Sequence, residues 1–371
     1  MASATTQSVI EAGSRRRPVD DVSMQSLLAY ARGRLAAAAA FPKARLFRRD
    51  LRLARLDMTV WFASEALADL CGRKLVLRES ARPFEAAAEI FALDAEAEGW
   101  EMPAAWRESS GFSSREFDRT LALGNVRGFY DHDAPSWQFF DSAAGIGVQT
   151  LPTPLGMPPW EEGSPLRLFL HWAYAAAGMR LTHAATLGYN GRGALMVGAS
   201  GSGKSGTTLA GLLNGLSSVG DDYVLVEQGD GVVAHSVFGV FKQDPQGLRR
   251  AGLPPERLAD RRLNWHGKIE FDAARLSPDG FAERMDIRAL LLPEIARSKH
   301  TRIERVSAQR AALALAPSSV FQLAGDAGEG FRFLADLARR LPAYRVSLSE
   351  EPAEIAASIR SFLEREAEHS G

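Results

Sequence analysis

The chain has 371 residues, with 44 Lys and Arg, 45 Asp and Glu, and a formal net charge of −1. This length allows two domains with buried cores, and the apolar and charged fractions are those of an ordinary globular protein. The balanced charge indicates neither nucleic acid nor an anionic membrane surface as a partner. Because Cys71 is the single cysteine, an internal disulfide is excluded. No signal peptide or membrane-length apolar run is evident, so we expect a cytoplasmic protein.

The first 150 residues mix helical and strand patterns. Residues 1–13 are mostly small and polar and are followed by a short basic run, so residues 1–22 are expected to form a disordered tail. Periodicity predicts strands within Arg45–Ala63, Gly128–Phe140 and Gly145–Gln149, and helices over Ser23–Ala40, Pro83–Ala95 and Ser114–Leu123. The arginines of the first strand pattern fit a polar face better than an anion site. We therefore expect an α+β N-terminal domain over residues 23–150.

Residues 151–163 are rich in proline, which predicts a connector to a second domain over residues 164–365. Ser164 is a candidate N-cap, with Pro165 at the first position of a helix that reaches Gly178. Strands are then predicted over Leu181–Leu187 and Gly193–Val197, joined by a hairpin-type turn at Gly188–Gly191.

Residues Gly198–Ser205 match the phosphate-binding loop pattern G-x-x-x-x-G-K-S. The pattern follows an apolar strand and precedes a helical stretch, a context that directs backbone N–H groups and the positive end of a helix at phosphate. The candidate nucleotide-binding residues are Gly198, Ser200, Gly201, Ser202, Gly203, Lys204, Ser205, Gly206 and Thr207. Lys204 can reach the outer phosphates and Ser205 can bind Mg²⁺. The alternative is a glycine-rich turn with a chance lysine.

Two adjacent carboxylates, Asp221 and Asp222, lie past the loop helix at the edge of an apolar strand. One could anchor Mg²⁺ and the other could accept a proton from an attacking hydroxyl. An Asp-Asp turn without function is the alternative. His183, which we expect on the strand before the loop strand, could lie close enough to tune the protonation of this site, or could be a core residue.

The set of His183, Gly198–Ser205 and Gly220–Val224 resembles the catalytic domain of HPr kinase/phosphorylase and its kinase-like relatives. The resemblance extends over roughly residues 166–363. It implies an α/β P-loop kinase domain of the HPr kinase C-terminal type, with ATP and Mg²⁺ as cofactors. It also implies oligomers, so a homo-oligomer is possible.

Carried over residue by residue, the resemblance assigns Lys204 to the β/γ phosphates and Ser205 to Mg²⁺. It makes Asp221 the base toward the acceptor hydroxyl and Asp222 part of the Mg²⁺ shell, in an order that the sequence leaves open. His183 would lie close to both carboxylates. A second family signature, acidic-x-Arg-Gly-Leu-Gly, is replaced here by Gly239–Arg250 and Arg261–Lys268. Because of this difference, the resemblance does not extend to HPr as the acceptor or to the reverse phosphorylase reaction, and both stay open.

Cations must balance the charge that develops on a transferred phosphoryl group. Lys242 and Lys268 are the candidates, with Arg249, Arg250, Arg261 and Arg262 as alternatives, and surface positions as the competing interpretation. The sequence therefore predicts an ATP-dependent kinase that phosphorylates a hydroxyl, either a serine of a protein or peptide or a small-molecule or saccharide alcohol. A nucleotide-dependent switch or scaffold with slow hydrolysis is the rival from another class.

Overall fold

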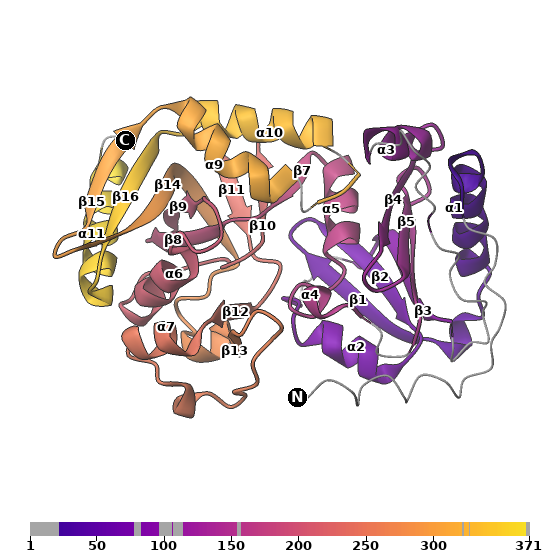
Figure 1. Cartoon of the computed structure of the whole chain (residues 1–371), viewed down its shortest axis with the longest axis horizontal. Coiled ribbons are helices and arrows are strands. Elements are labelled where there is room, and N and C mark those ends of the chain that lie inside the picture. The colour runs from indigo at the N-terminus through magenta and orange to yellow at the C-terminus, as the bar shows by residue number, and fades with distance from the viewer. Residues whose placement is uncertain are drawn as a thin grey trace, which may run out of the picture.

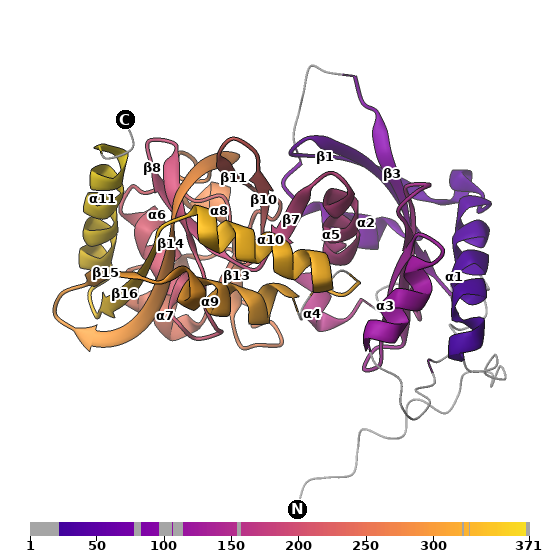
Figure 2. The ribbon, with the colours of Figure 1, turned by 90° about the horizontal axis from the view of Figure 1, so that it is seen from above.

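The computed structural model describes residues 22–77, 83–95, 106, 114–153, 157–320, 323–325 and 327–368. The tail expected over residues 1–22 lies outside the described residues, apart from Val22, and so does part of the connector. In Figures 1 and 2 the chain forms two mixed α/β halves side by side, with helix α5 between their sheets. No helix among the described residues has the length and apolarity needed to cross a membrane.

The N-terminal half is built on a six-stranded sheet in the order β1-β2-β3-β6-β5-β4. Its strands are β1 (Phe47–Leu53), β2 (Leu56–Phe62), β3 (Ala86–Asp94), β4 (Val126–Asp131), β5 (Ser136–Asp141) and β6 (Ile146–Leu151). The β2–β3 and β3–β6 pairs are parallel, and the other pairs are antiparallel. Helices α1 (Met24–Ala39) and α3 (Ser114–Ala122) cover one face, where Leu27 and Phe117 join a cluster around Trp137.

The helix expected over Pro83–Ala95 is wrong, because this segment contains strand β3. The strand lies between β2 and β6 and pairs with both in parallel. A strand covered on both faces carries a nearly continuous apolar run, and such a run cannot be distinguished from a buried helix by periodicity. Ile90, Phe91, Ala92 and Leu93 are all buried.

The other face of the N-terminal sheet is packed against the C-terminal half. Helices α2 (Glu65–Gly72) and α5 (Arg167–Ala176) lie on this face, and α4 (Pro159–Glu162) precedes α5. One apolar cluster joins Met58 and Ile90 of the first sheet, Phe169 of α5, and Tyr223 and Phe238 of the second half. The two halves therefore share a core and form one packed unit.

The expected N-cap at Ser164 is also wrong. The residue that precedes α5 is Leu166, with left-handed φ of 60° and no side-chain cap. Ser164 is buried, and its N–H donates to the carbonyl of Glu161 at the end of α4. The residues just before α5 form the separate short helix α4, so Ser164 ends α4 and does not cap α5.

The C-terminal half has an eight-stranded sheet, whose hydrogen-bonded path runs β15-β16-β14-β11-β10-β7, with β9 on β14 and β8 on β9. Its strands are β7 (Met179–Thr182), β8 (Ala185–Tyr189), β9 (Arg192–Met196), β10 (Val224–Gln228), β11 (Val232–His235), β14 (Arg284–Ser298), β15 (Arg302–Val306) and β16 (Ala343–Ser349). The long strand β14 pairs in parallel with β9 and β16. Asn190 and Gly191, both with positive φ, form the predicted turn between β8 and β9.

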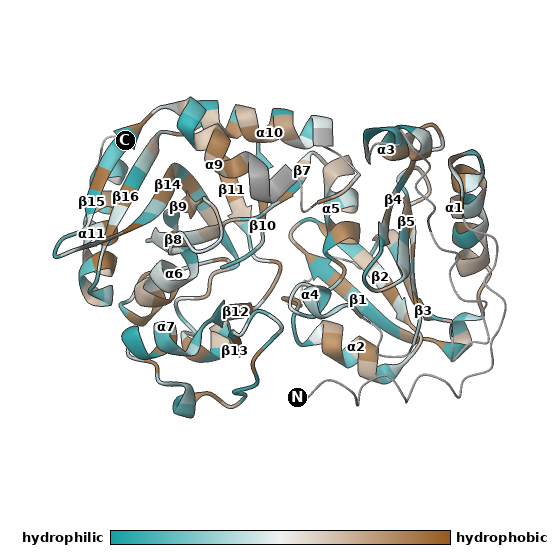
Figure 3. Cartoon of the chain, viewed as in Figure 1, coloured by the Kyte–Doolittle hydropathy of each residue, from teal (hydrophilic) through white to brown (hydrophobic). Residues whose placement is uncertain are grey.

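Helices cover both faces of this sheet. They are α6 (Lys204–Leu213), α9 (Ala308–Val320), α10 (Ala327–Arg340) and α11 (Pro352–Glu368). One apolar cluster joins α9 and α10 to one face, and another joins α11 to the opposite face. In Figure 3 hydrophobic and hydrophilic segments alternate along α9 and α10, as expected for helices with one buried side.

A small appendage packs against α6. It consists of the paired strands β12 (Val240–Gln243) and β13 (Ile269–Asp272), the helices α7 (Pro245–Arg250) and α8 (Ala273–Leu276), and the short 3₁₀ turn η2 (Pro255–Arg257). A second 3₁₀ turn, η1 (Lys43–Arg45), belongs to the N-terminal half. Leu209 of α6, Phe241 of β12 and Leu248 of α7 share an apolar cluster. The appendage thus has a fixed position next to the start of α6.

His171 of α5 gives the fold a predictable pH dependence. It is 3% exposed, and neither ring nitrogen has a hydrogen-bond partner among the described residues. The pKa of His171 is lowered to about 3, mainly because the residue is buried and also because of the positive charges of Arg180 and Arg127. The unfolded chain therefore binds a proton between about pH 6.5 and pH 3 that the folded chain does not, so stability falls as the pH is lowered through this window.

We predict that His171→Leu reduces this acid sensitivity. Between pH 6 and pH 4 the free energy of unfolding of the wild type should fall by up to about 1.4 kcal/mol per pH unit from this residue alone. Denaturant titrations at several pH values measure the slope, with His132→Leu as a control from an ordinary surface position. Equal slopes in the wild type and His171→Leu would contradict the prediction.

Candidate functional site

The phosphate-binding loop follows β9 and leads directly into α6, so the strand–loop–helix context is present. Three glycines of the loop have positive φ: Gly198 (145°), Gly201 (79°) and Gly203 (106°). An added Cβ on Gly203 would lie 2.6 Å from Cδ1 of Leu348. Glycine at this position is therefore required both by the backbone conformation and by the close approach of β16.

Lys204 folds back over the loop. Its Nζ donates hydrogen bonds to the carbonyl oxygens of Gly198 (2.6 Å) and Ala199 (3.1 Å), and the residue is 7% exposed. Burial lowers the pKa of Lys204, while the charges of Asp222 and Asp221 act in the opposite direction. The ammonium group thus lies within electrostatic reach of both carboxylates.

The remaining loop residues differ in their surroundings. Ser200 is exposed. The hydroxyls of Ser202 and Thr207 are buried and have no hydrogen-bond partner within the described part of the chain. Gly206 approaches the side chain of Gln243 from β12, since an added Cβ would lie 3.2 Å from its Nε2. Unpartnered buried hydroxyls are costly, so these two groups are free to take a further hydrogen-bond partner.

Asp221 and Asp222 lie between α6 and β10, next to the loop. Their segment is held to β8, because the N–H of Thr186 donates to the carbonyl of Gly220 (3.0 Å) and Ser218 bonds to the backbone of Gly220. This arrangement fixes where the two carboxylates point.

The Asp222 carboxylate is clamped by two side chains. His183 Nε2 lies 2.9 Å from Oδ1, and Lys242 Nζ lies 2.9 Å from Oδ2. Burial acts to raise the pKa of Asp222, but Lys242 and His183 outweigh it and hold that pKa well below its usual range. About a third of the Asp222 side chain (32%) remains exposed, so the group is ionised at neutral pH and open to solvent.

Asp221 has a different environment. It is 5% exposed, and its Oδ2 accepts a hydrogen bond from the backbone N–H of Lys242 (3.2 Å). Its Oδ1 is buried and has no hydrogen-bond partner among the described residues. Burial and then the neighbouring charge of Asp222 raise the pKa of Asp221 to about 6, whereas the Lys242 N–H, the Ser205 hydroxyl and Lys268 oppose the rise.

His183 contacts Asp222, although it does not lie on a strand as expected. The predicted strand over Leu181–Leu187 is two strands, β7 and β8, and His183 lies in the bend between them. The bend lets β7 pair with β10 while β8 pairs with β9. This change of partner aims the imidazole at the carboxylates, and its ring lies 5.3 Å from that of Tyr223.

The two candidate lysines, Lys242 and Lys268, lie at different distances from the aspartates. Lys242 of β12 contacts both aspartates directly. Lys268 precedes β13, and its charge affects the pKa values of Asp221 and Lys204 from farther away. Lys204, Asp221, Asp222, His183 and Lys242 therefore form one cluster beside the loop. The arginine alternatives Arg249 and Arg262 instead form exposed ion pairs with Glu256 and Asp260.

Three further residues near Lys242 were not found from the sequence. They are Glu270, opposite Lys242 on β13, Gly163 in the connector, and Lys74 after α2, which pairs with Glu270. Gly163 and Lys74 are 79 and 168 residues away along the chain, which no local pattern spans.

The donor set fits Mg²⁺. This ion is usually held by one or two protein oxygens together with phosphate oxygens. Ser205 offers a hydroxyl, and the unpartnered Oδ1 of Asp221 offers a carboxylate oxygen beside it. No group of three or more His, Cys, Asp or Glu side chains suited to a metal occurs within the described ranges.

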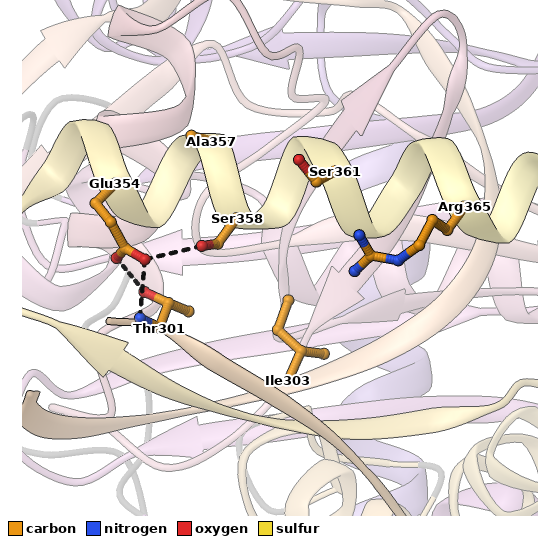
Figure 4. Close-up of a pocket in the computed structure, with 7 residues that line it drawn as sticks. All are labelled: Thr301, Ile303, Glu354, Ala357, Ser358, Ser361 and Arg365. Carbon is orange, nitrogen blue, oxygen red and sulfur yellow. Dashed lines mark hydrogen bonds between the residues drawn. The ribbon is translucent and has the colours of Figure 1, made fainter. Parts of the chain in front are cut away.

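A separate hollow lies between β15 and α11, lined by Thr301, Ile303, Glu354, Ala357, Ser358, Ser361 and Arg365 (Figure 4). Glu354 accepts bonds from the Thr301 N–H (2.9 Å), the Thr301 hydroxyl (2.7 Å) and the Ser358 hydroxyl (2.9 Å). Its oxygens are therefore used to hold the start of β15 to α11, which indicates a structural role.

No family model matches the chain, and no curated protein matches it. Among solved structures, the HPr(Ser) kinase/phosphatase from Coxiella burnetii is similar over 52% of this chain and 99% of its own length. The identity is 14% and the TM-score is 0.29, so this likeness is a distant one and carries no weight for the function. The chemistry of the site rests on the residues described above.

The loop geometry yields a prediction about stability. Gly201 has φ of 79° with open space around an added Cβ, whereas a Cβ on Gly203 would also collide with Leu348. We expect Gly203→Ala to lower the free energy of unfolding by about 1–3 kcal/mol more than Gly201→Ala. Denaturant unfolding measures the difference, and equal losses in the two variants would mean that β16 does not crowd the loop.

Proposed function

We propose that this protein is an ATP-dependent phosphotransferase that moves the γ-phosphoryl group to a hydroxyl. The observation that carries the proposal is the clamped carboxylate of Asp222, which lies next to a phosphate-binding loop and faces solvent. A loop alone would support nucleotide binding, but an oriented and accessible base beside it also supports transfer to an acceptor.

The two aspartates are proposed to act in the reverse of the order that the family resemblance assigns. Asp221 is buried, lies beside Ser205 and has one free oxygen, so it suits the Mg²⁺ shell. Asp222 has one oxygen held by the imidazole of His183 and the other by the ammonium group of Lys242, and it is the more accessible of the two, so it suits the acceptor. Bound Mg²⁺ would neutralise charge on the phosphates.

In the proposed reaction the acceptor oxygen forms a bond to the γ-phosphorus, and the bond from that phosphorus to ADP breaks. ADP leaves with the electron pair, and the proton of the acceptor hydroxyl passes to the Asp222 carboxylate. His183 and Lys242 hold that carboxylate in place. Lys204, released from the carbonyls of Gly198 and Ala199, and Lys242 offset the negative charge on the transferred group, with Lys268 contributing at longer range.

The acceptor is proposed to be a serine of a protein or peptide, on the strength of the sequence resemblance. A small-molecule or saccharide alcohol is the alternative acceptor. ATP is proposed as the donor because no guanine-reading Asn-Lys-x-Asp stretch is evident in the sequence. A cytoplasmic location and a possible homo-oligomer stay predictions.

The test is transfer of labelled γ-phosphate from ATP to panels of serine peptides, proteins and sugar alcohols. We predict stoichiometric labelling of an acceptor and ADP release by the wild type. Asp222→Asn should lower kcat by about 10²–10⁴-fold with ATP affinity retained. Asp221→Asn should instead raise the Mg²⁺ concentration needed for half-maximal rate.

Two outcomes would contradict the proposal. Slow phosphate release without a labelled acceptor, unchanged in Asp222→Asn, would favour the switch or scaffold. A Mg²⁺ requirement that changes in Asp222→Asn and not in Asp221→Asn would restore the order of roles expected from the sequence. Asp230→Asn, in the exposed turn between β10 and β11, is the control for loss of a carboxylate near the same strand.

A further inference from the structure

The position of Lys242 is set by more than Asp222. Its side chain is 16% exposed, and Nζ lies 2.9 Å from Asp222 Oδ2. On the neighbouring strand β13, Glu270 is its register partner. The charge of Glu270 stabilises the protonated form of Lys242 and acts with Asp222 to raise the pKa of Lys242 against the effect of burial. The ammonium group of Lys242 thus pairs with Asp222 and also lies in the field of the Glu270 charge.

Glu270 is restrained from two sides. Its Oε1 accepts a hydrogen bond from Asn264 Nδ2 (3.2 Å), and its Oε2 forms an ion pair with Lys74 Nζ (2.6 Å). The side chains of Lys74 and Glu270 are 20% and 17% exposed. Because the pair is sheltered, its loss would leave a poorly solvated carboxylate beside Lys242.

Lys74 belongs to the N-terminal half. It follows α2, and its segment is joined to the C-terminal half by backbone bonds. The N–H of Gly239 donates to the carbonyl of Lys74 (2.9 Å), and the N–H of Val76 donates to the carbonyl of Val237 (2.9 Å). Residues 237–239 lead directly into β12, the strand that carries Lys242.

Gly163 in the connector limits the space around the end of the Lys242 side chain. An added Cβ would lie 2.5 Å from Lys242 Nζ, 2.6 Å from its Cε and 2.8 Å from Glu270 Oε1. The φ of Gly163 is −81°, which any residue can adopt, so glycine is needed here for space alone. A methyl group would displace the flexible end of Lys242 at little cost to the backbone.

We propose that Lys74 and Gly163 are positioning residues for Lys242, so that the transfer centre is completed by the N-terminal half and the connector. Charges alternate from Asp222 through its ion-pair partner Lys242, across the strand register to Glu270, and on to the ion-pair partner of Glu270, Lys74. Lys74 neutralises the charge of Glu270, so that Lys242 stays paired with Asp222. Without Lys74, the freed carboxylate of Glu270 draws the ammonium group toward β13 and away from the transfer site. The inference rests on the proposed function, in which Lys242 offsets phosphoryl charge.

The first test is kinetic. Lys74→Met should lower kcat by about 10–100-fold, as expected for a misplaced catalytic group, and leave ATP affinity within about twofold. Lys74→Arg should restore most of the rate. Arg55→Met is the matched control, because Arg55 forms the exposed ion pair with Glu227 (2.7 Å) that also joins the two halves. Its kcat should equal that of the wild type.

A double-mutant cycle shows whether Lys74 acts through Lys242. In a Lys242→Met background the group to be positioned is gone, so adding Lys74→Met should change kcat by less than about twofold. Gly163→Ala should reproduce the loss of rate in the wild-type background with an unchanged midpoint of thermal unfolding. The inference would be overturned if Lys74→Met lowered kcat in the Lys242→Met background as much as in the wild type. Equal effects of Lys74→Met and Arg55→Met on kcat would also overturn it.

A structural readout separates this inference from the proposed function. If the wild type phosphorylates no acceptor, the proposed function fails, and crystal structures of the wild type and Lys74→Met still decide the position of Lys242. The inference predicts that the Lys242–Asp222 contact is lost in the variant. A contact retained at 2.9 Å would overturn the inference whatever the activity.

Discussion

The Asp222 carboxylate, held between the imidazole of His183 and the ammonium group of Lys242, is the interaction on which the site depends. Each partner comes from a different element: a bend between β7 and β8, the segment before β10, and the appended strand β12. A partly exposed carboxylate with two cationic or hydrogen-bonding partners stays ionised and keeps one orientation. The phosphate-binding loop lies beside it because β9 pairs with β8, which begins directly after the same bend.

This constraint extends to the relation between the two halves. Strand β12 would present Lys242 poorly if it were held by β13 alone, since a two-stranded ribbon is only marginally stable. Here the appendage packs on α6 through Leu209, Phe241 and Leu248, and it is joined to the N-terminal half through residues 237–239. The shared apolar core therefore fixes the site as well as the fold.

Local patterns predicted the loop, the adjacent aspartates and the helices α1, α3, α5 and α6, because each depends on residues close in sequence. The misread segments have physical causes. Strand β3 is buried on both faces and lacks alternation, and Ser164 is used to end α4 before α5 begins. The bend at His183 arises from a change of strand partner, which the sequence of one strand does not encode.

The sequence could not supply the environment of each aspartate. Asp221 and Asp222 are adjacent and identical in type, yet one is buried beside Ser205 and the other is clamped by His183 and Lys242. That difference comes from tertiary contacts and changes which role suits which residue. Lys74 and Gly163 lie far from the loop in sequence, and only the packing of the two halves brings Lys74 to Glu270 and Gly163 to Lys242.

The central claim is that the loop and the aspartate pair form one phosphoryl-transfer centre, and a crystal structure with a non-hydrolysable ATP analogue and Mg²⁺ tests it most directly. The account predicts that Lys204 Nζ leaves the carbonyls of Gly198 and Ala199 for the terminal phosphate. It also predicts the metal between Ser205 and Asp221, and the terminal phosphate facing Asp222. Phosphates bound away from the loop, or a metal bound by Asp222 with Lys204 still on its own backbone, would contradict it.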